Sequence, residues 1–171
     1  MSDNCNLDCN TCGPEQFQSV HGGKTENITS NRGHGISYSQ KVKELVRSMV
    51  GCNTREDMTE IYKENDENVY TADFGTFSKC GDEVRVFLKL NKDKTIIEDY
   101  TWSCTGCYGS LSSSAYVYQK IIGMKVSDFN IQILSKEIME ELELPEIKKH
   151  CASYPLAAIK IALDKINKEV K

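Results

Sequence analysis

The spacing of apolar residues predicts a helix over residues 37–51. Its apolar residues recur every three or four positions and so share one helical face: Val42, Leu45, Val46 and Met49. Ser37 and Gln40 have the spacing of a capping box at the start of this helix, and Gly51 is placed to end it. The inward residues of a second helix, predicted after Thr54, are Met58, Ile61 and Tyr62.

The period of the pattern changes to two in the next part of the chain. Every second position between residues 84 and 90 is apolar, namely Val84, Val86, Leu88 and Leu90. Such alternation is typical of a β-strand with one buried face. We predict a hairpin turn at residues 91–94, a return strand at residues 95–103 and a weaker third strand at residues 69–74. The expected sheet is therefore small, three-stranded and antiparallel.

Helical spacing returns further along the chain. A helix is predicted from Ser110 to Gly123, and its apolar positions are Leu111, Ala115, Val117 and Ile121. Ser135 is the predicted N-cap of a helix that runs to about Leu142. The last helix has a stripe of buried residues, Ile159, Leu163, Ile166 and Val170. Helices before and after the strands predict an α+β domain with the helices packed on one face of the sheet.

Residues 1–36 show neither the spacing of a helix nor the alternation of a strand. They are rich in Asn, Gly, Ser and Thr, so we expect a flexible tail. Residues 37–171 form the predicted domain, because an apolar content of 39% in 171 residues is enough for one core.

The net charge of −4 comes from acidic and basic residues that are mixed along the chain, which argues against nucleic acid as a partner. No apolar run has the length of a membrane span or a signal peptide, so we expect a cytoplasmic protein without a membrane partner.

Eight cysteines are many for a chain expected in a reducing compartment, where thiols more often serve metal or sulfur chemistry than disulfides. Cys80, Cys107 and Cys151 each lie in a short polar context, and the fold must bring them together to make one site. Asp82 and His150 would arrive with them. Such a donor set is typical of an exposed, labile iron or zinc centre.

The surroundings of these thiols favour the charged form. Cys107 precedes a run of small residues that opens a helix, and the helix dipole would lower the pKa of its thiol. Cys151 follows Lys148, Lys149 and His150, whose positive charge would act in the same direction. A single cysteine is more often a buried, inert residue. Three cysteines in polar settings instead favour a functional site. Cys104 forms a C-x-x-C pair with Cys107, and we expect it to be an auxiliary residue of that site.

These motifs resemble the IscU/NifU-type iron-sulfur cluster scaffold family from about residue 38 to the end of the chain. The opening at residues 38–42 (Tyr-Ser-Gln-Lys-Val), Cys80-Gly81-Asp82, Gly106-Cys107 with its serine run, and residues 140–151 are similar to successive family motifs. The resemblance implies a transient [2Fe-2S] cluster held by Cys80, Cys107 and Cys151 with Asp82 or His150. It also implies that Cys151 accepts persulfide sulfur and that Asp82 makes the cluster labile.

The same resemblance implies a scaffold or carrier protein, not an enzyme. Its implied partners are a cysteine desulfurase, recipient apoproteins and an electron donor such as ferredoxin. Lys148 matches the lysine of the family's chaperone-binding segment Leu-Pro-Pro-Val-Lys, but Glu146 replaces a proline there. This charge argues against dependence on the dedicated Hsp70 chaperone.

The tail contains a C-x-x-x-C-x-x-C motif formed by Cys5, Cys9 and Cys12. It resembles the start of Mrp-type cluster carriers, which implies a second site for an iron-sulfur cluster or zinc. The alternative is an unstructured tract that binds adventitious metal.

Two other functions fit the same residues. In the first, Cys80, Asp82, Cys107 and Cys151 hold zinc, and Cys151 leaves the metal to take sulfur from a desulfurase. In the second, the site is a structural zinc module, against which the acidic ligand argues.

Overall fold

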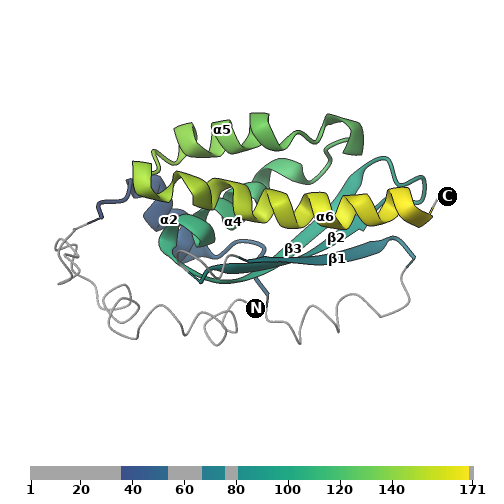
Figure 1. Cartoon of the computed structure of the whole chain (residues 1–171), viewed down its shortest axis with the longest axis horizontal. Helices are drawn as coiled ribbons and strands as arrows, with labels where there is room; N and C mark the ends of the chain where they lie inside the picture. Colours follow the sequence, from purple (N-terminus) through teal and green to yellow (C-terminus); the bar gives the residue numbers. More distant parts are fainter. Residues whose placement is uncertain (1–35, 54–66, 76–80, 170–171) are drawn as a thin grey trace.

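A three-stranded antiparallel sheet forms the base of the fold in the computed structural model, which describes residues 36–53, 67–75 and 81–169 (Figure 1). The strands are β1 (Val69–Gly75), β2 (Glu83–Leu90) and β3 (Ile97–Thr105), in the order β1-β2-β3. Both pairs are antiparallel. The predicted sheet is confirmed.

The return strand begins two residues later than predicted, because the hairpin turn is longer than its four polar residues suggest. The side-chain oxygen of Asn91 accepts hydrogen bonds from the backbone N–H groups of Thr95 and Ile96, at 2.8 and 3.0 Å. Lys94 adopts a left-handed conformation with φ of 56°. These contacts hold residues 95 and 96 in the turn, so that pairing starts at Ile97.

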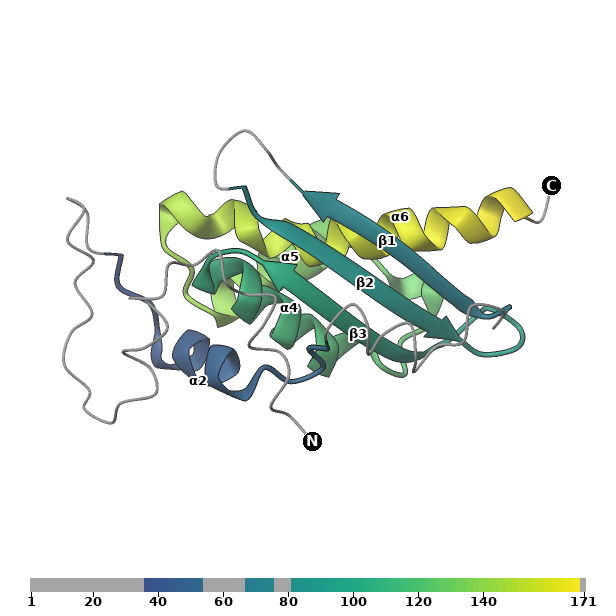
Figure 2. The ribbon, with the colours of Figure 1, turned by 90° about the horizontal axis from the view of Figure 1, so that it is seen from below.

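One face of the sheet packs against the helices and holds the core (Figure 2). The alternating residues of β2 all point to this face, and Val84, Val86, Leu88 and Leu90 are at most 1% exposed. From β3, Tyr100 and Trp102 join them and are fully buried. The alternation of apolar and polar residues in β2 therefore reflects the burial of one face of this strand.

The described residues contain four α-helices on that face, in two layers (Figure 1). α4 (Tyr108–Ile121) and α6 (Tyr154–Glu169) pack directly on the sheet, and α2 (Gln40–Ser48) packs against α4. α5 (Ile131–Glu141) lies over α6 and η2. The 3₁₀ segments are η1 (Val126–Asp128) and η2 (Glu146–Ser153). The predicted α+β arrangement with helices on one face is confirmed.

Two predicted N-caps are wrong. α2 is capped by Ser39, whose hydroxyl oxygen accepts from the N–H of Val42 at 3.3 Å, and the proposed box at Ser37 does not form. α5 begins at Ile131, because the side chain of Asn130 accepts from the N–H of Ile133 at 3.1 Å. Ser135 therefore lies inside this helix. In both cases a neighbouring polar residue makes the capping bond.

Two further boundaries differ from the prediction. α2 ends at Ser48 because Met49, with φ of 45°, already takes the left-handed conformation that was assigned to Gly51. Gly51 instead opens a short segment beside β3, in which Cys52 bridges to Trp102. α4 begins at Tyr108, before the predicted Ser110.

Several predictions fall outside the described residues. They are the helix after Thr54, the tail with its Cys5, Cys9 and Cys12 motif, Cys80, and the inward position of Val170. Within the part of the chain that the structure describes, no helix has the length and apolar character needed to cross a membrane.

Candidate metal centre

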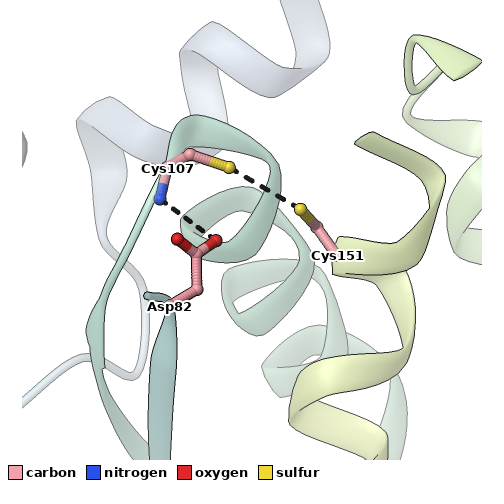
Figure 3. A group of neighbouring side chains, drawn as sticks. All are labelled: Asp82, Cys107 and Cys151. Atoms are coloured by element: carbon pink, nitrogen blue, oxygen red, sulfur yellow. Dashed lines mark hydrogen bonds between the residues drawn. The ribbon is translucent and has the colours of Figure 1, made fainter. Parts of the chain in front are cut away.

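Three side chains from separate segments converge at one end of the sheet (Figure 3). Asp82 lies just before β2, Cys107 occupies the position before the first residue of α4, and Cys151 lies in η2. Each offers one ligand atom, and these atoms all lie within 4.8 Å of one another. The two sulfurs are 3.6 Å apart. Asp82 and Cys151 are buried, and Cys107 is partly exposed.

Asp82 is held toward the thiols by its neighbours. Gly81 has φ of +68°, a conformation open to glycine, and turns the chain immediately before it. The carboxylate accepts the backbone N–H of Cys107 at 3.4 Å and the hydroxyl of Ser110, both at Oδ2. These bonds satisfy a side chain that is only 3% exposed.

Two glycines beside Cys107 leave room for the other two ligands. A Cβ at position 106 would lie 3.0 Å from Cγ of Asp82, and one at position 109 would lie 3.2 Å from Sγ of Cys151. Both distances are shorter than ordinary carbon contacts. Any larger residue at Gly106 or Gly109 would therefore press on a proposed ligand.

The two thiols are hydrogen-bonded to each other. The hydrogen bond from Cys151 lowers the pKa of Cys107 to about 6, against the opposing effect of burial and of the Asp82 charge. The same hydrogen bond, followed by burial, raises the pKa of Cys151. The pair therefore loses its first proton at a lower pH than an isolated thiol would, and its second proton at a higher pH. The direction at Cys151 is opposite to the one expected from its sequence neighbours, whereas the charge of Lys148 lowers the pKa of Cys107.

Tyr38 also belongs to this site, although its sequence context marked it only as part of a family motif. Burial raises the pKa of its phenol, and so do the Cys107 charge and a hydrogen bond with the Cys107 side chain. Its ring packs on Tyr108, with 5.7 Å between centroids. Tyr38 therefore keeps its proton beside the sulfur. Tyr38 and Ser110 both lie in family motifs, but the sequence pattern alone does not assign their side chains to the site.

The other residues singled out from the sequence lie in different surroundings. The ring of His150 lies 5.6 Å from that of Tyr154, and His150 is not in the group of three ligand atoms that the described residues form. Cys104 is 2% exposed and belongs to the hydrophobic core. Cys52 is half-buried. Cys80 lies outside the described residues.

Two thiols and a carboxylate can hold a metal together. Zinc accepts cysteine sulfur and carboxylate oxygen in a tetrahedral set, and iron-sulfur clusters are bound by thiolates. A hard oxygen among soft sulfurs is a poorer match to iron and sulfide, so such a site favours exchange over permanent binding.

Residues 53–171 match the family model described as NifU-like N terminal domain. The chain belongs to this family. Escherichia coli strain K12 has a relative named "Iron-sulfur cluster assembly scaffold protein IscU", which is 36% identical over 102 residues, or 60% of this chain and 77% of the relative. A relative in Saccharomyces cerevisiae, "Iron sulfur cluster assembly protein 2, mitochondrial", is 34% identical over 49% of this chain and 53% of its own length.

Two solved structures share the fold of this NifU-like domain. One is a scaffold protein from Fervidobacterium islandicum described as putative for the SUF system, with a TM-score of 0.51, 21% identity and coverage of 74% of this chain and 96% of that one. The other is the N-terminal part of a NifU-like protein from Brucella abortus, with a TM-score of 0.52, 16% identity and coverage of 76% and 94%. At these identities the likeness concerns the fold.

Proposed function

We propose that this protein is a scaffold that assembles a labile [2Fe-2S] cluster and transfers it to recipient apoproteins. The convergence of Asp82, Cys107 and Cys151 from three segments is the observation on which this proposal rests. Membership of the NifU-like family and the relatives named as scaffolds support it. The cluster is cargo, and the protein acts as a carrier.

In this proposal Cys80, Cys107 and Cys151 supply sulfur ligands, and Asp82 supplies the oxygen. Asp82 makes the cluster transferable, because its oxygen is the ligand least suited to iron-sulfide. Cys80 is assigned from its place two residues before Asp82 in the sequence.

We further propose that Cys151 receives sulfur from the persulfide of a cysteine desulfurase. The proton shared by the pair must first move to Cys107, which leaves Cys151 as the thiolate. This thiolate attacks the outer sulfur, a new S–S bond forms, the desulfurase S–S bond breaks, and the desulfurase cysteine leaves as thiolate. Reduction of the bound sulfur to sulfide takes two electrons, which a ferredoxin-type donor would supply.

A zinc-dependent sulfur acceptor is the second candidate. The same Asp82, Cys107 and Cys151 group, completed by Cys80, has the ligand types of a tetrahedral zinc site. In that case Cys151 would leave the metal to take the sulfur.

Metal and sulfide analysis of the full chain, purified without oxygen, tests the scaffold proposal. We expect about two iron and two sulfide in the folded domain after incubation with iron, cysteine and a desulfurase, as a [2Fe-2S] cluster requires. About one zinc per chain without sulfide, unchanged by that incubation, would instead support the sulfur acceptor.

The Asp82→Ala variant separates the two functions further. If the scaffold proposal holds, the cluster should pass to an apo-ferredoxin more slowly than from the wild type, because the exchangeable ligand is gone. A zinc site should instead lose affinity, because one ligand of its tetrahedral set is missing. Asp93→Ala, in the exposed turn after β2, is the matched control. An unchanged transfer rate in Asp82→Ala would contradict the role of this carboxylate.

A further inference from the structure

Ser110 touches all three members of the metal-ligand group. It lies in the first turn of α4 and is fully buried. Its hydroxyl donates to Oδ2 of Asp82, and its oxygen lies 3.9 Å from Sγ of Cys107. Its side chain is also hydrogen-bonded to Cys151. A single hydroxyl therefore lies against one ligand from each of the three converging segments.

The other buried serines of α4 have different partners. The hydroxyl of Ser112 donates to the carbonyl of Gly109, and that of Ser114 donates to the carbonyl of Ser110. Both bonds stay within the helix and are common for serine in a helix interior. Among the described residues of α4, the hydroxyl of Ser110 is the one whose hydrogen bond reaches the Asp82 carboxylate.

The bond to Asp82 has a physical consequence for metal binding. Asp82 is 3% exposed, and its hydrogen bonds come from the Ser110 hydroxyl and the Cys107 N–H, both at Oδ2. The N–H bond is long, at 3.4 Å. Without the hydroxyl, the carboxylate would keep one weak bond and could rotate away from the sulfurs. Groups that orient metal ligands in this way typically change metal affinity by 10–100-fold.

We propose that Ser110 is a positioning residue that fixes Asp82 within the metal-ligand set. For cluster transfer this inference rests on the proposed scaffold function, whereas for metal binding it stands on the ligand geometry alone. Loss of the hydroxyl should therefore reproduce, in weaker form, the loss of the Asp82 carboxylate.

Cobalt binding tests this directly, because Co²⁺ in a thiolate site gives visible absorption bands that report its ligands. The background is the full chain with Cys5, Cys9 and Cys12 changed to Ser, so that the tail does not contribute. The variants compared are Ser110→Ala, Asp82→Ala, the double variant and Ser114→Ala. Each is titrated with Co²⁺ against a competing chelator, and metal-free unfolding is measured in parallel.

We expect Ser110→Ala to raise the Kd for Co²⁺ by about 10–100-fold and to shift the visible bands toward those of Asp82→Ala. The double variant should bind as Asp82→Ala does, because the hydroxyl has no carboxylate left to orient. Ser114→Ala should match the background. The double variant also removes the buried charge, so it remains informative if Ser110→Ala alone folds poorly.

Two results would overturn the inference. One is a Kd for Ser110→Ala within about twofold of the background, which is far below the expected change. The other is additive loss in the double variant, which would show that Ser110 acts independently of Asp82. If the Co²⁺ results are as expected but no iron-sulfur cluster forms on the wild type, the scaffold function fails and the positioning role stands.

Discussion

At the scale of single residues, the properties of a thiol depend on its contacts more than on its neighbours in the chain. Lys148, Lys149 and His150 precede Cys151, yet the pKa of Cys151 is raised by its hydrogen bond with Cys107 and by burial. The same hydrogen bond lowers the pKa of Cys107 to about 6. The contact of 3.6 Å between the two sulfurs couples the titration of the two thiols.

This pair predicts the pH dependence of alkylation in the metal-free protein. The rate of Cys107 modification by iodoacetamide should rise with pH around a midpoint near 6, because only the thiolate reacts. Below this pH Cys107 keeps its proton and the rate should fall. Mass spectrometry of the peptide that contains Cys107 measures the rate.

The Cys151→Ala variant removes the donor, so the midpoint should move up toward the ordinary cysteine value of about 8.5. Cys52→Ala, at the edge of β3, is the control and should keep the wild-type midpoint. A midpoint that stays near 6 in Cys151→Ala would show that the helix terminus, and not Cys151, lowers the pKa of Cys107.

At the scale of elements, a residue that caps a helix can also connect segments that are far apart in the sequence. The hydroxyl of Ser39 accepts from the N–H of Val42 and donates to the carbonyl of Leu142 at 2.8 Å. It therefore caps α2 and ties it to the end of α5. The next residue toward the N-terminus, Tyr38, contacts Cys107. The cap thus helps to place a side chain of the metal centre.

Loss of this cap should destabilise the fold. Ser39→Ala removes both bonds and should lower the free energy of unfolding by about 1–2 kcal/mol, measured by urea denaturation. Ser37→Ala is the matched control, because Ser37 is exposed and does not cap the helix. An equal loss in both variants would contradict the cap observed at Ser39.

At the scale of the whole molecule, the fold brings Asp82, Cys107 and Cys151 together from segments that are far apart in the sequence. Asp82 precedes Cys107 by 25 residues, and Cys107 precedes Cys151 by 44. β2, α4 and η2 hold these residues at one end of the sheet (Figure 3). The Cys5, Cys9 and Cys12 motif is therefore predicted to be dispensable for a cluster in the domain.

A full chain with Cys5, Cys9 and Cys12 changed to Ser tests this independence. We expect it to keep about two iron and two sulfide after reconstitution, as a [2Fe-2S] cluster in the domain requires. Cys107→Ser in the same background should lose them, because a thiolate ligand is gone. Loss of iron and sulfide in the tail variant alone would place the cluster on the tail instead.

Local patterns predicted much of this protein because they depend on the order of side chains along one element. Val84, Val86, Leu88 and Leu90 marked a strand with one buried face, and Ile159, Leu163 and Ile166 marked the buried stripe of α6. Helix starts were less predictable, since Ser37 and Ser39 are equally good caps in isolation. Only the contact with Leu142 and the bond to Val42 favour Ser39.

By itself, the sequence determined the strands, most of the helices, the family motifs and the residues with metal-binding chemistry. Only the tertiary structure decided that Asp82, Cys107 and Cys151 lie within 4.8 Å of one another, that the two thiols are hydrogen-bonded, and that Ser110 donates to the carboxylate. The spacing of apolar residues along the sequence indicates which face of a helix or strand is buried. The distance between atoms on different elements depends on how those elements pack, and that packing sets the chemistry of the site.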